Sequence, residues 1–140
     1  MQSIIKKSFD LIDRNISDKL QLWVERGDDI NQTKDMLDVI DTVKDLIMSV
    51  KTEKDIILYR GCYYMDNCDE PDMNDRIVSF TSYPHIAESF GTVHKIKIPK
   101  GSNIFYMSAI DKYLMRRCEE FEFVMWEPKI IKKNGEFIVT

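Results

Sequence analysis

The sequence IVSFTSYPHIAESFG, residues 77–91, is the most informative stretch of the chain for its fold. Its first five residues are rich in β-branched and aromatic side chains, which is typical of a strand. Pro84 suits the first position of a helix, and either Ser82 or Tyr83 suits the cap before it. Gly91 suits the end of that helix. The stretch therefore predicts a strand that passes directly into a short helix.

The size of the chain predicts a single domain over residues 1–140, because 140 residues can form one hydrophobic core but are too few for two. Hydrophobic residues make up 44% and charged residues 31% of the sequence, which is ordinary for a globular protein and argues against disorder. Within the domain we expect a helical N-terminal part, residues 1–52, and a β-rich core, residues 53–140.

Two apolar stripes in the first fifty residues predict helices. The first stripe, with spacings of three and four, predicts a helix that Gly27 ends, and it consists of Ile5, Phe9, Ile12, Ile16, Leu20 and Trp23. The second stripe consists of Met36, Ile40, Val43, Ile47 and Val50. Both stripes indicate helices that pack on a core or on each other, although a partner-binding helix would show the same pattern.

Short strands are expected in the rest of the chain. Besides residues 77–81, we expect strands at 56–59, where Arg60-Gly61 ends the run, at 93–98 and at 121–126. The dipeptide Asn134-Gly135 between the runs 130–131 and 137–139 predicts a hairpin with a type I′ turn. Residues 62–75 are expected to form a long loop, a turn is expected at 99–101, and residues 107–118 are ambiguous. Helices followed by many short strands predict an α+β fold.

The charge balance and the motifs that are missing exclude several classes of protein. The net charge of −4 argues against a nucleic-acid or anionic-membrane partner, and no apolar run approaches the roughly 18 residues of a membrane span. Lys6, Lys7 and Asp10 argue against a secretory signal. No G-x-G-x-x-G motif is present, so a dinucleotide would have to be held in another way.

The few cysteines and histidines predict a protein without a metal that acts in a reducing compartment. Two histidines leave little material for a zinc site. The three cysteines are odd in number and lack a zinc-type spacing, which predicts free thiols and a cytoplasmic location; they are Cys62, Cys68 and Cys118. Secretion by a route that needs no cleaved signal is the alternative.

Three motifs on different strands carry the residues that suggest chemistry. They are Tyr59-Arg60-Gly61, then Ser79-Phe80-Thr81 followed by Ala87 and Phe90, and then Glu120-Phe121-Glu122. If the strands are neighbours, an arginine, a hydroxyl and two carboxylates meet in one cleft. Alternation of side chains along a strand predicts that Glu120 and Glu122 share one face, and that Phe121, Phe123 and Met125 form the core face. Taken singly, each residue also fits an ordinary surface or strand position.

The order of these motifs resembles the arginine–serine–Glu-x-Glu signature of the arginine-specific mono-ADP-ribosyltransferases, and a phage-type member is one possibility by analogy. The resemblance covers roughly residues 55–140. It implies N-terminal helices packed on a small mixed or antiparallel split β-sandwich, with residues 53–140 as the NAD-binding catalytic core. It also implies NAD as a substrate, release of nicotinamide, and a target protein with an exposed arginine, since Glu-x-Glu accompanies arginine acceptors in this family.

The resemblance also implies roles for individual residues. Glu122 would stabilise the positive charge that forms on the ribose, and Glu120 would position and deprotonate the acceptor arginine. Ser79 would orient Glu122 by a hydrogen bond. Binding of NAD would involve Ser79 as well as Arg60, Gly61, Thr81 and Phe90, with Gly61 allowing the ligand close to the backbone. Phe90 or Tyr64 would stack on nicotinamide or line its pocket.

Departures from the family pattern leave rival functions open. The second position of the family's Ser-Thr-Ser is Phe80 here, and no arginine follows closely after Phe90. The rivals are an NAD glycohydrolase, a transferase that modifies a nucleic acid or small molecule, and a non-catalytic interaction module on the same scaffold.

Overall fold

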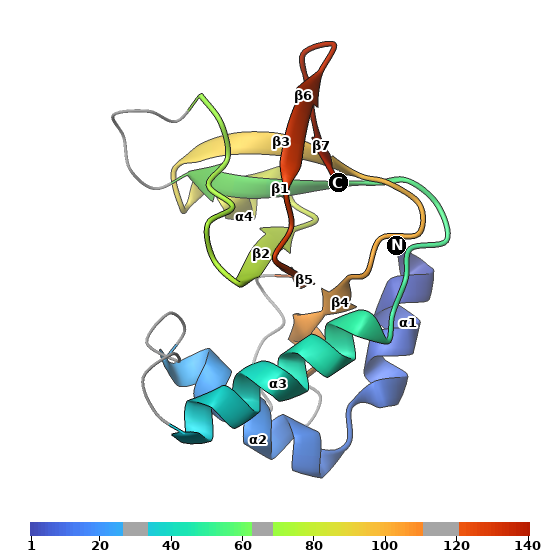
Figure 1. Cartoon of the computed structure of the whole chain (residues 1–140), viewed down its shortest axis with the longest axis vertical. Coiled ribbons are helices and arrows are strands. Elements are labelled where there is room, and N and C mark those ends of the chain that lie inside the picture. The colour runs from blue at the N-terminus through green and yellow to red at the C-terminus, as the bar shows by residue number, and fades with distance from the viewer. Residues whose placement is uncertain (27–33, 63–68, 111–120) are drawn as a thin grey trace.

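The computed structural model describes residues 1–26, 34–62, 69–110 and 121–140 (Figure 1). Its helices are α1 (Gln2–Leu11), α2 (Arg14–Arg26), α3 (Lys34–Met48) and α4 (Pro84–Glu88), together with the short 3₁₀ helix η2 (Met107–Ile110). Its strands are β1 (Ile56–Cys62), β2 (Ile77–Thr81), β3 (Thr92–Ile98), β4 (Phe105–Tyr106), β5 (Glu122–Trp126), β6 (Ile130–Lys133) and β7 (Glu136–Val139). This α+β composition confirms the predicted fold class.

The strands form one mixed sheet in the order β4-β5-β2-β1-β3-β7-β6. Strands β3 and β7 run parallel, and the other neighbours are antiparallel. Strand β1 pairs with β3 over its whole length, and β2 pairs likewise with β5. Strands β1 and β2, in contrast, meet only at Tyr59 and Thr81. This narrow junction divides the sheet into a helix-side half (β4-β5-β2) and a hairpin-side half (β1-β3-β7-β6).

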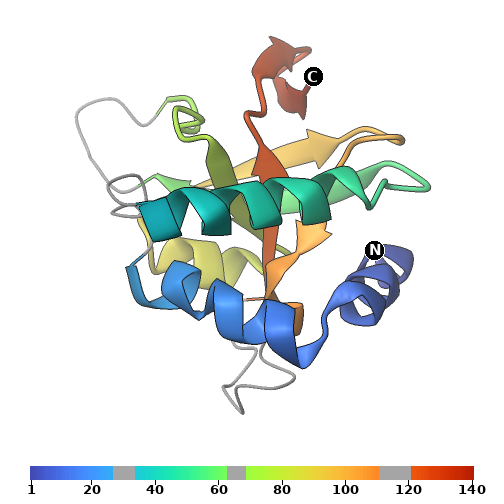
Figure 2. The ribbon, with the colours of Figure 1, turned by 60° about the horizontal axis from the view of Figure 1, so that its bottom comes forward.

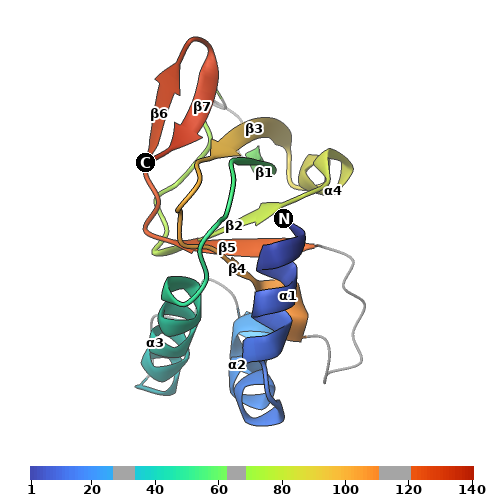
Figure 3. The same ribbon diagram turned by 90° about the vertical axis from the view of Figure 1, so that its right-hand side faces the viewer.

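The helices are distributed unequally over these halves. Figure 3 shows α1, α2 and α3 on the side of β4 and β5, and the β6–β7 hairpin at the opposite end. Figure 2 shows α2 and α3 lying alongside each other. The short helix α4 packs against β1, β2 and β3. Buried side chains of α1–α3 and of both halves form one core, which includes the fully buried Leu20, Ile47, Leu58, Ile98, Phe105 and Phe123.

The first apolar stripe is divided between two helices, so its prediction as one helix was wrong. Helix α1 ends at Leu11, and the backbone of the next residue, Ile12, is extended at φ −89° and ψ 116°. The side chain of Asp13 then accepts the N–H of Ile16 at 2.8 Å and starts α2. A carboxylate in this position satisfies an N–H that lacks a partner within the helix, which makes a new helix start favourable. The end predicted at Gly27 lies outside the described residues.

Two strand predictions have different outcomes. Strand β1 continues through Arg60 and Gly61 instead of ending before them, because pairing with β3 continues there. The predicted hairpin is confirmed: Lys133 lies opposite Glu136, and the two turn residues Asn134 and Gly135 have φ angles of 53° and 80°. Positive φ at both positions is the geometry of a type I′ turn.

The other strand and helix predictions agree closely with the structure. Strand β2 covers 77–81 as predicted, and α4 begins at Pro84 with Tyr83 as its N-cap. Strand β3 begins one residue earlier than expected, and η2 occupies the start of the ambiguous stretch. Among the described residues, none of the helices combines the length and apolar character that crossing a membrane would require.

Candidate active site

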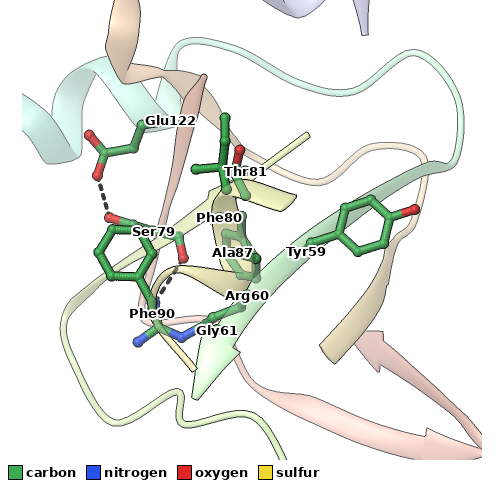
Figure 4. Close-up of a pocket in the computed structure, with 10 residues that line it drawn as sticks. Tyr59, Arg60, Gly61, Ser79, Phe80, Thr81, Ala87, Phe90 and Glu122 are labelled. Carbon is green, nitrogen blue, oxygen red and sulfur yellow. Dashed lines mark hydrogen bonds between the residues drawn. The ribbon is translucent and has the colours of Figure 1, made fainter. Parts of the chain in front are cut away.

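A pocket of about 380 Å³ lies at the junction between the two halves of the sheet (Figure 4). Its walls come from β1, β2, the first residue of β5, α4 and the residues that follow α4. The lining residues are Tyr59, Arg60, Gly61, Ser79, Phe80, Thr81, Ile86, Ala87, Phe90 and Glu122. The structure thus brings the predicted arginine, hydroxyl and one of the two predicted carboxylates to one cavity.

Glu122 is held at the start of β5 and its carboxylate contacts Ser79. The Ser79 hydroxyl donates a hydrogen bond of 2.6 Å to Oε2 of Glu122 (Figure 4). The register explains the contact, since Glu122 lies opposite Thr81 and Ser79 lies opposite Val124 on the adjacent strands. Both side chains are half-buried. A short hydrogen bond to a carboxylate fixes the orientation of that carboxylate.

Arg60 connects the two halves of the sheet. Its Nη1 donates to the carbonyl of Ser79 at 2.8 Å, and its Nε donates to the carbonyl of Asp72 at 2.7 Å. Because a guanidinium has its N–H groups in a rigid plane, these two bonds fix the orientation of that plane. Arg60 therefore supplies a positive charge to the pocket and also ties β1 to β2 where the backbone pairing is sparse.

Gly61 is required by the packing of α4 on β1. A Cβ at this position would lie 2.2 Å from the carbonyl oxygen of Ala87 and 2.8 Å from Cβ of Phe90. The expected reason for this glycine was close approach of a ligand to the backbone. The structure gives a different reason, since any side chain here would push the helix away from the strand.

Thr81 and Phe90, the other two residues predicted to bind NAD, also line the pocket. Thr81 is buried, and its hydroxyl accepts the N–H of Tyr83 at 3.3 Å, next to the start of α4. Phe90, which lines the pocket, is 44% exposed. An exposed aromatic face beside a polar cavity is suited to stacking on a planar ligand.

The alternation argument for Glu120 fails at Phe121, and Glu120 itself lies outside the described residues. Phe121 has a φ angle of 44°, which is not the extended backbone that places alternate side chains on one face. Its ring packs edge-on against Tyr83, with ring centroids 4.6 Å apart. Phe123 and Met125 are buried as predicted, but Val124 on the opposite face is buried too. Tyr64 also lies outside the described residues.

The structure is similar to solved ADP-ribosyltransferases. Plx2a, an ADP-ribosyltransferase toxin from Paenibacillus larvae, matches with a TM-score of 0.65 at 14% identity, over 99% of this chain and 90% of that chain. The ADP-ribosylating toxin BECa of C. perfringens, solved with NADH, matches with 0.60 at 14% identity, over 99% of this chain and 45% of that chain. ADP-ribosyltransferase Vis in complex with agmatine matches with a TM-score of 0.54 at 12% identity, over 99% of this chain and 80% of that chain.

The chain has the ADP-ribosyltransferase fold. No protein-family model and no curated protein matches its sequence. The structural similarity extends over α1–α3, because it covers 99% of the chain. The sequence resemblance was expected to begin only near residue 55, since the helices carry none of the motifs.

Several residues of the site are not among the predicted site residues. Tyr59, Phe80 and Ile86 line the pocket, and of these Tyr59 and Phe80 are direct neighbours of predicted residues. Ser108 accepts the backbone N–H of Glu122 at 2.8 Å. The sequence contains no motif that points to Ser108, because it lies 14 residues before Glu122 in a stretch without periodicity.

Proposed function

We propose that the protein is a mono-ADP-ribosyltransferase that transfers ADP-ribose from NAD to an arginine side chain of a target protein and releases nicotinamide. The observation that carries this proposal is the 2.6 Å contact between Ser79 and Glu122 in a pocket that also holds Arg60. The ADP-ribosyltransferase fold of the chain also supports it.

Glu122 is suited to the first chemical event. When the bond between C1′ of the ribose and nicotinamide breaks, the bonding electrons leave with nicotinamide and positive charge develops on the ribose. A carboxylate that is already oriented stabilises this charge without reorganising, and the effect is largest where water is scarce. Ser79 provides that orientation by donating its hydroxyl proton to Oε2.

Arg60 and Phe90 are suited to holding two different parts of NAD, the central pyrophosphate and the nicotinamide at one end. The guanidinium of Arg60 attracts the pyrophosphate, and its two backbone bonds keep it in place for this task. The half-exposed ring of Phe90 offers a face for nicotinamide. The pocket volume of about 380 Å³ is within the range of small-molecule sites.

The Glu-x-Glu motif and one structural relative favour a guanidinium acceptor. Glu120 precedes Glu122 by two residues and would take the proton that the guanidinium nitrogen loses as it bonds to C1′. The Vis structure contains agmatine, which carries the same guanidinium group as an arginine side chain. The BECa structure contains NADH, a reduced form of the proposed donor.

The proposal is tested by incubating the purified protein with labelled NAD and agmatine, and separately with labelled NAD and cell lysate. We expect nicotinamide release, ADP-ribosylated agmatine, and lysate proteins that carry the added mass on arginine. The Glu122→Gln variant is the matched control and should form none of these products. Free ADP-ribose without a modified acceptor would identify an NAD glycohydrolase. If calorimetry detects no binding of NAD to the folded protein, the chain would be an interaction module.

We also propose that the protein acts in a reducing cytoplasm, because its three cysteines are odd in number. A phage-type enzyme that modifies host proteins would act in that compartment.

A further inference from the structure

The backbone N–H of Glu122 is bound by a side chain instead of by a neighbouring strand. Strand β4 pairs with β5 only at Phe105–Val124 and Tyr106–Phe123. At Met107 the chain leaves the ladder and enters η2. The hydroxyl of Ser108, which is 6% exposed, accepts the N–H of Glu122 at 2.8 Å. Ser108 therefore takes the place of the strand carbonyl that a continued ladder would provide.

The residue before Glu122 makes this bond important for the position of the carboxylate. Phe121 has a φ angle of 44°, which is unfavourable for a bulky side chain and is kept only where the surroundings hold it. The Phe121 ring contacts Tyr83, and the Ser108 bond holds the backbone N–H of the next residue, Glu122. Both contacts act on the backbone next to Glu122, which also lies opposite Thr81 on β2.

The N-terminal helices hold the segment that carries Ser108. Ser8 on α1 accepts the N–H of Tyr106 at 2.9 Å, and Ser17 on α2 donates its hydroxyl to the carbonyl of Ile110 at 2.9 Å. Both serines are fully buried. These bonds lie immediately before and at the end of η2, so the helices hold the segment on both sides of Ser108.

We propose that Ser108 is a positioning residue for the carboxylate of Glu122, and that α1 and α2 act through it by fixing η2. The proposal deepens the proposed function and rests on it. Ser108 contacts the backbone of Glu122, so it acts on the rate of the chemical step and leaves the NAD-binding residues Arg60 and Phe90 unchanged.

The kinetic test compares Ser108→Ala with Ser108→Thr, which keeps the hydroxyl. We expect Ser108→Ala to lower kcat for NAD cleavage about tenfold with an unchanged KM for NAD, and Ser108→Thr to restore most of kcat. If Ser108→Ala does not fold, Ser108→Cys replaces it, because a thiol is a weak acceptor of similar size. Equal loss of kcat in the Ala and Thr variants, or a change in KM alone, would overturn the proposal.

Thr52→Val is the matched control for the loss of a buried hydroxyl. Thr52 is 3% exposed, donates to the carbonyl of Pro99 at 2.9 Å and accepts the N–H of Ser102 at 3.1 Å. Its bonds also connect the end of the helical region to the turn between β3 and β4, but they do not touch β5. Thr52→Val should lower the melting temperature as Ser108→Ala does and leave kcat unchanged. A similar fall of kcat in both variants would show a general loss of stability instead of positioning.

A readout that does not need activity separates this proposal from the proposed function. The ¹³C resonance of the Glu122 carboxyl carbon should move in Ser108→Ala in the same direction as in Ser79→Ala, and stay in place in Thr52→Val. If wild-type protein neither cleaves NAD nor modifies agmatine, the proposed function fails while this measurement still decides whether Ser108 positions the carboxylate. An unchanged resonance in Ser108→Ala would reject the positioning role.

Discussion

The helix-side half and the hairpin-side half of the sheet differ in how their faces are covered. In β2 every residue except Ser79 is buried, and in β5 only the end residues Glu122 and Trp126 are partly exposed. In the hairpin-side half, β3 alternates between buried and less buried positions, and β6 has no buried residue. The helix-side half is thus a covered layer with one half-buried polar pair, whereas the other half has one face in solvent.

This difference corresponds to two kinds of task in the proposed reaction. Ser79 and Glu122 are surrounded by buried strands, where a fixed carboxylate interacts more strongly with developing charge than in water. Arg60 comes from the more open half and reaches across the junction to Ser79. The charge-stabilising residues and the cation that attracts phosphate are therefore on separate half-sheets that meet at Tyr59 and Thr81.

The largest expected effect comes from the polar pair of the covered half. Glu122→Gln should lower both NAD hydrolysis and transfer to agmatine by about a thousandfold, because the neutral amide no longer stabilises the charge on the ribose. Glu120→Gln is the paired variant, and it should lose transfer to agmatine while keeping hydrolysis. Both rates are measured by separating nicotinamide, ADP-ribose and modified agmatine. Intact transfer in both variants would show that the assigned roles are wrong.

The junction between the halves is tested by Arg60→Lys. A lysine keeps the charge but cannot donate to the carbonyls of Ser79 and Asp72 in the planar geometry of a guanidinium. We expect the KM for NAD to rise about tenfold and the free energy of unfolding to fall by about 2 kcal/mol, since bonds from charged donors are strong. Urea unfolding and NAD kinetics measure the two effects. Unchanged stability would mean that Arg60 does not hold the halves together.

The hairpin-side wall of the pocket is tested by Gly61→Ala. The new Cβ would collide with the carbonyl oxygen of Ala87, so α4 must move away from β1, and we expect a loss of about 2 kcal/mol in stability. The KM for NAD should rise several-fold because Phe90 moves with the helix. Gly101→Ala is the control: Gly101 has a φ of 85° and no atom near its Cβ position, so this change should lower stability without affecting KM.

The smallest effect concerns the end of the hairpin-side half, where Asp55 precedes β1. The hydrogen bond from the backbone N–H of Lys100 lowers the pKa of Asp55, with a smaller contribution from the charge of Lys97. Because the pKa is lower in the folded than in the unfolded protein, the bond stabilises the fold above pH about 4 and is lost as the pH falls below that. The difference in unfolding free energy between wild type and Asp55→Asn should therefore shrink from pH 6 to pH 3. A constant difference would contradict this linkage.

Local patterns predicted much of the fold. The residues of β2, the start of α4 at Pro84 and the turn at Asn134-Gly135 follow from short-range preferences, and the structure agrees. The patterns failed where a longer-range interaction decided the outcome. Asp13 divides the first stripe into two helices, and pairing with β3 extends β1 through Gly61, a residue that disfavours strands by itself.

The same distinction between local patterns and long-range contacts applies to the candidate site. The sequence by itself determined which groups were available: an arginine after a strand run, a serine within one, and a Glu-x-Glu before a third. Only the tertiary structure decided that Arg60, Ser79 and Glu122 meet at the narrow junction of two half-sheets, and that Phe121 turns the chain before Glu122. It also decided the roles of Gly61 and Ser108. Their partners, Ala87 and Glu122, lie 26 and 14 residues away, and no local pattern encodes contacts across such separations.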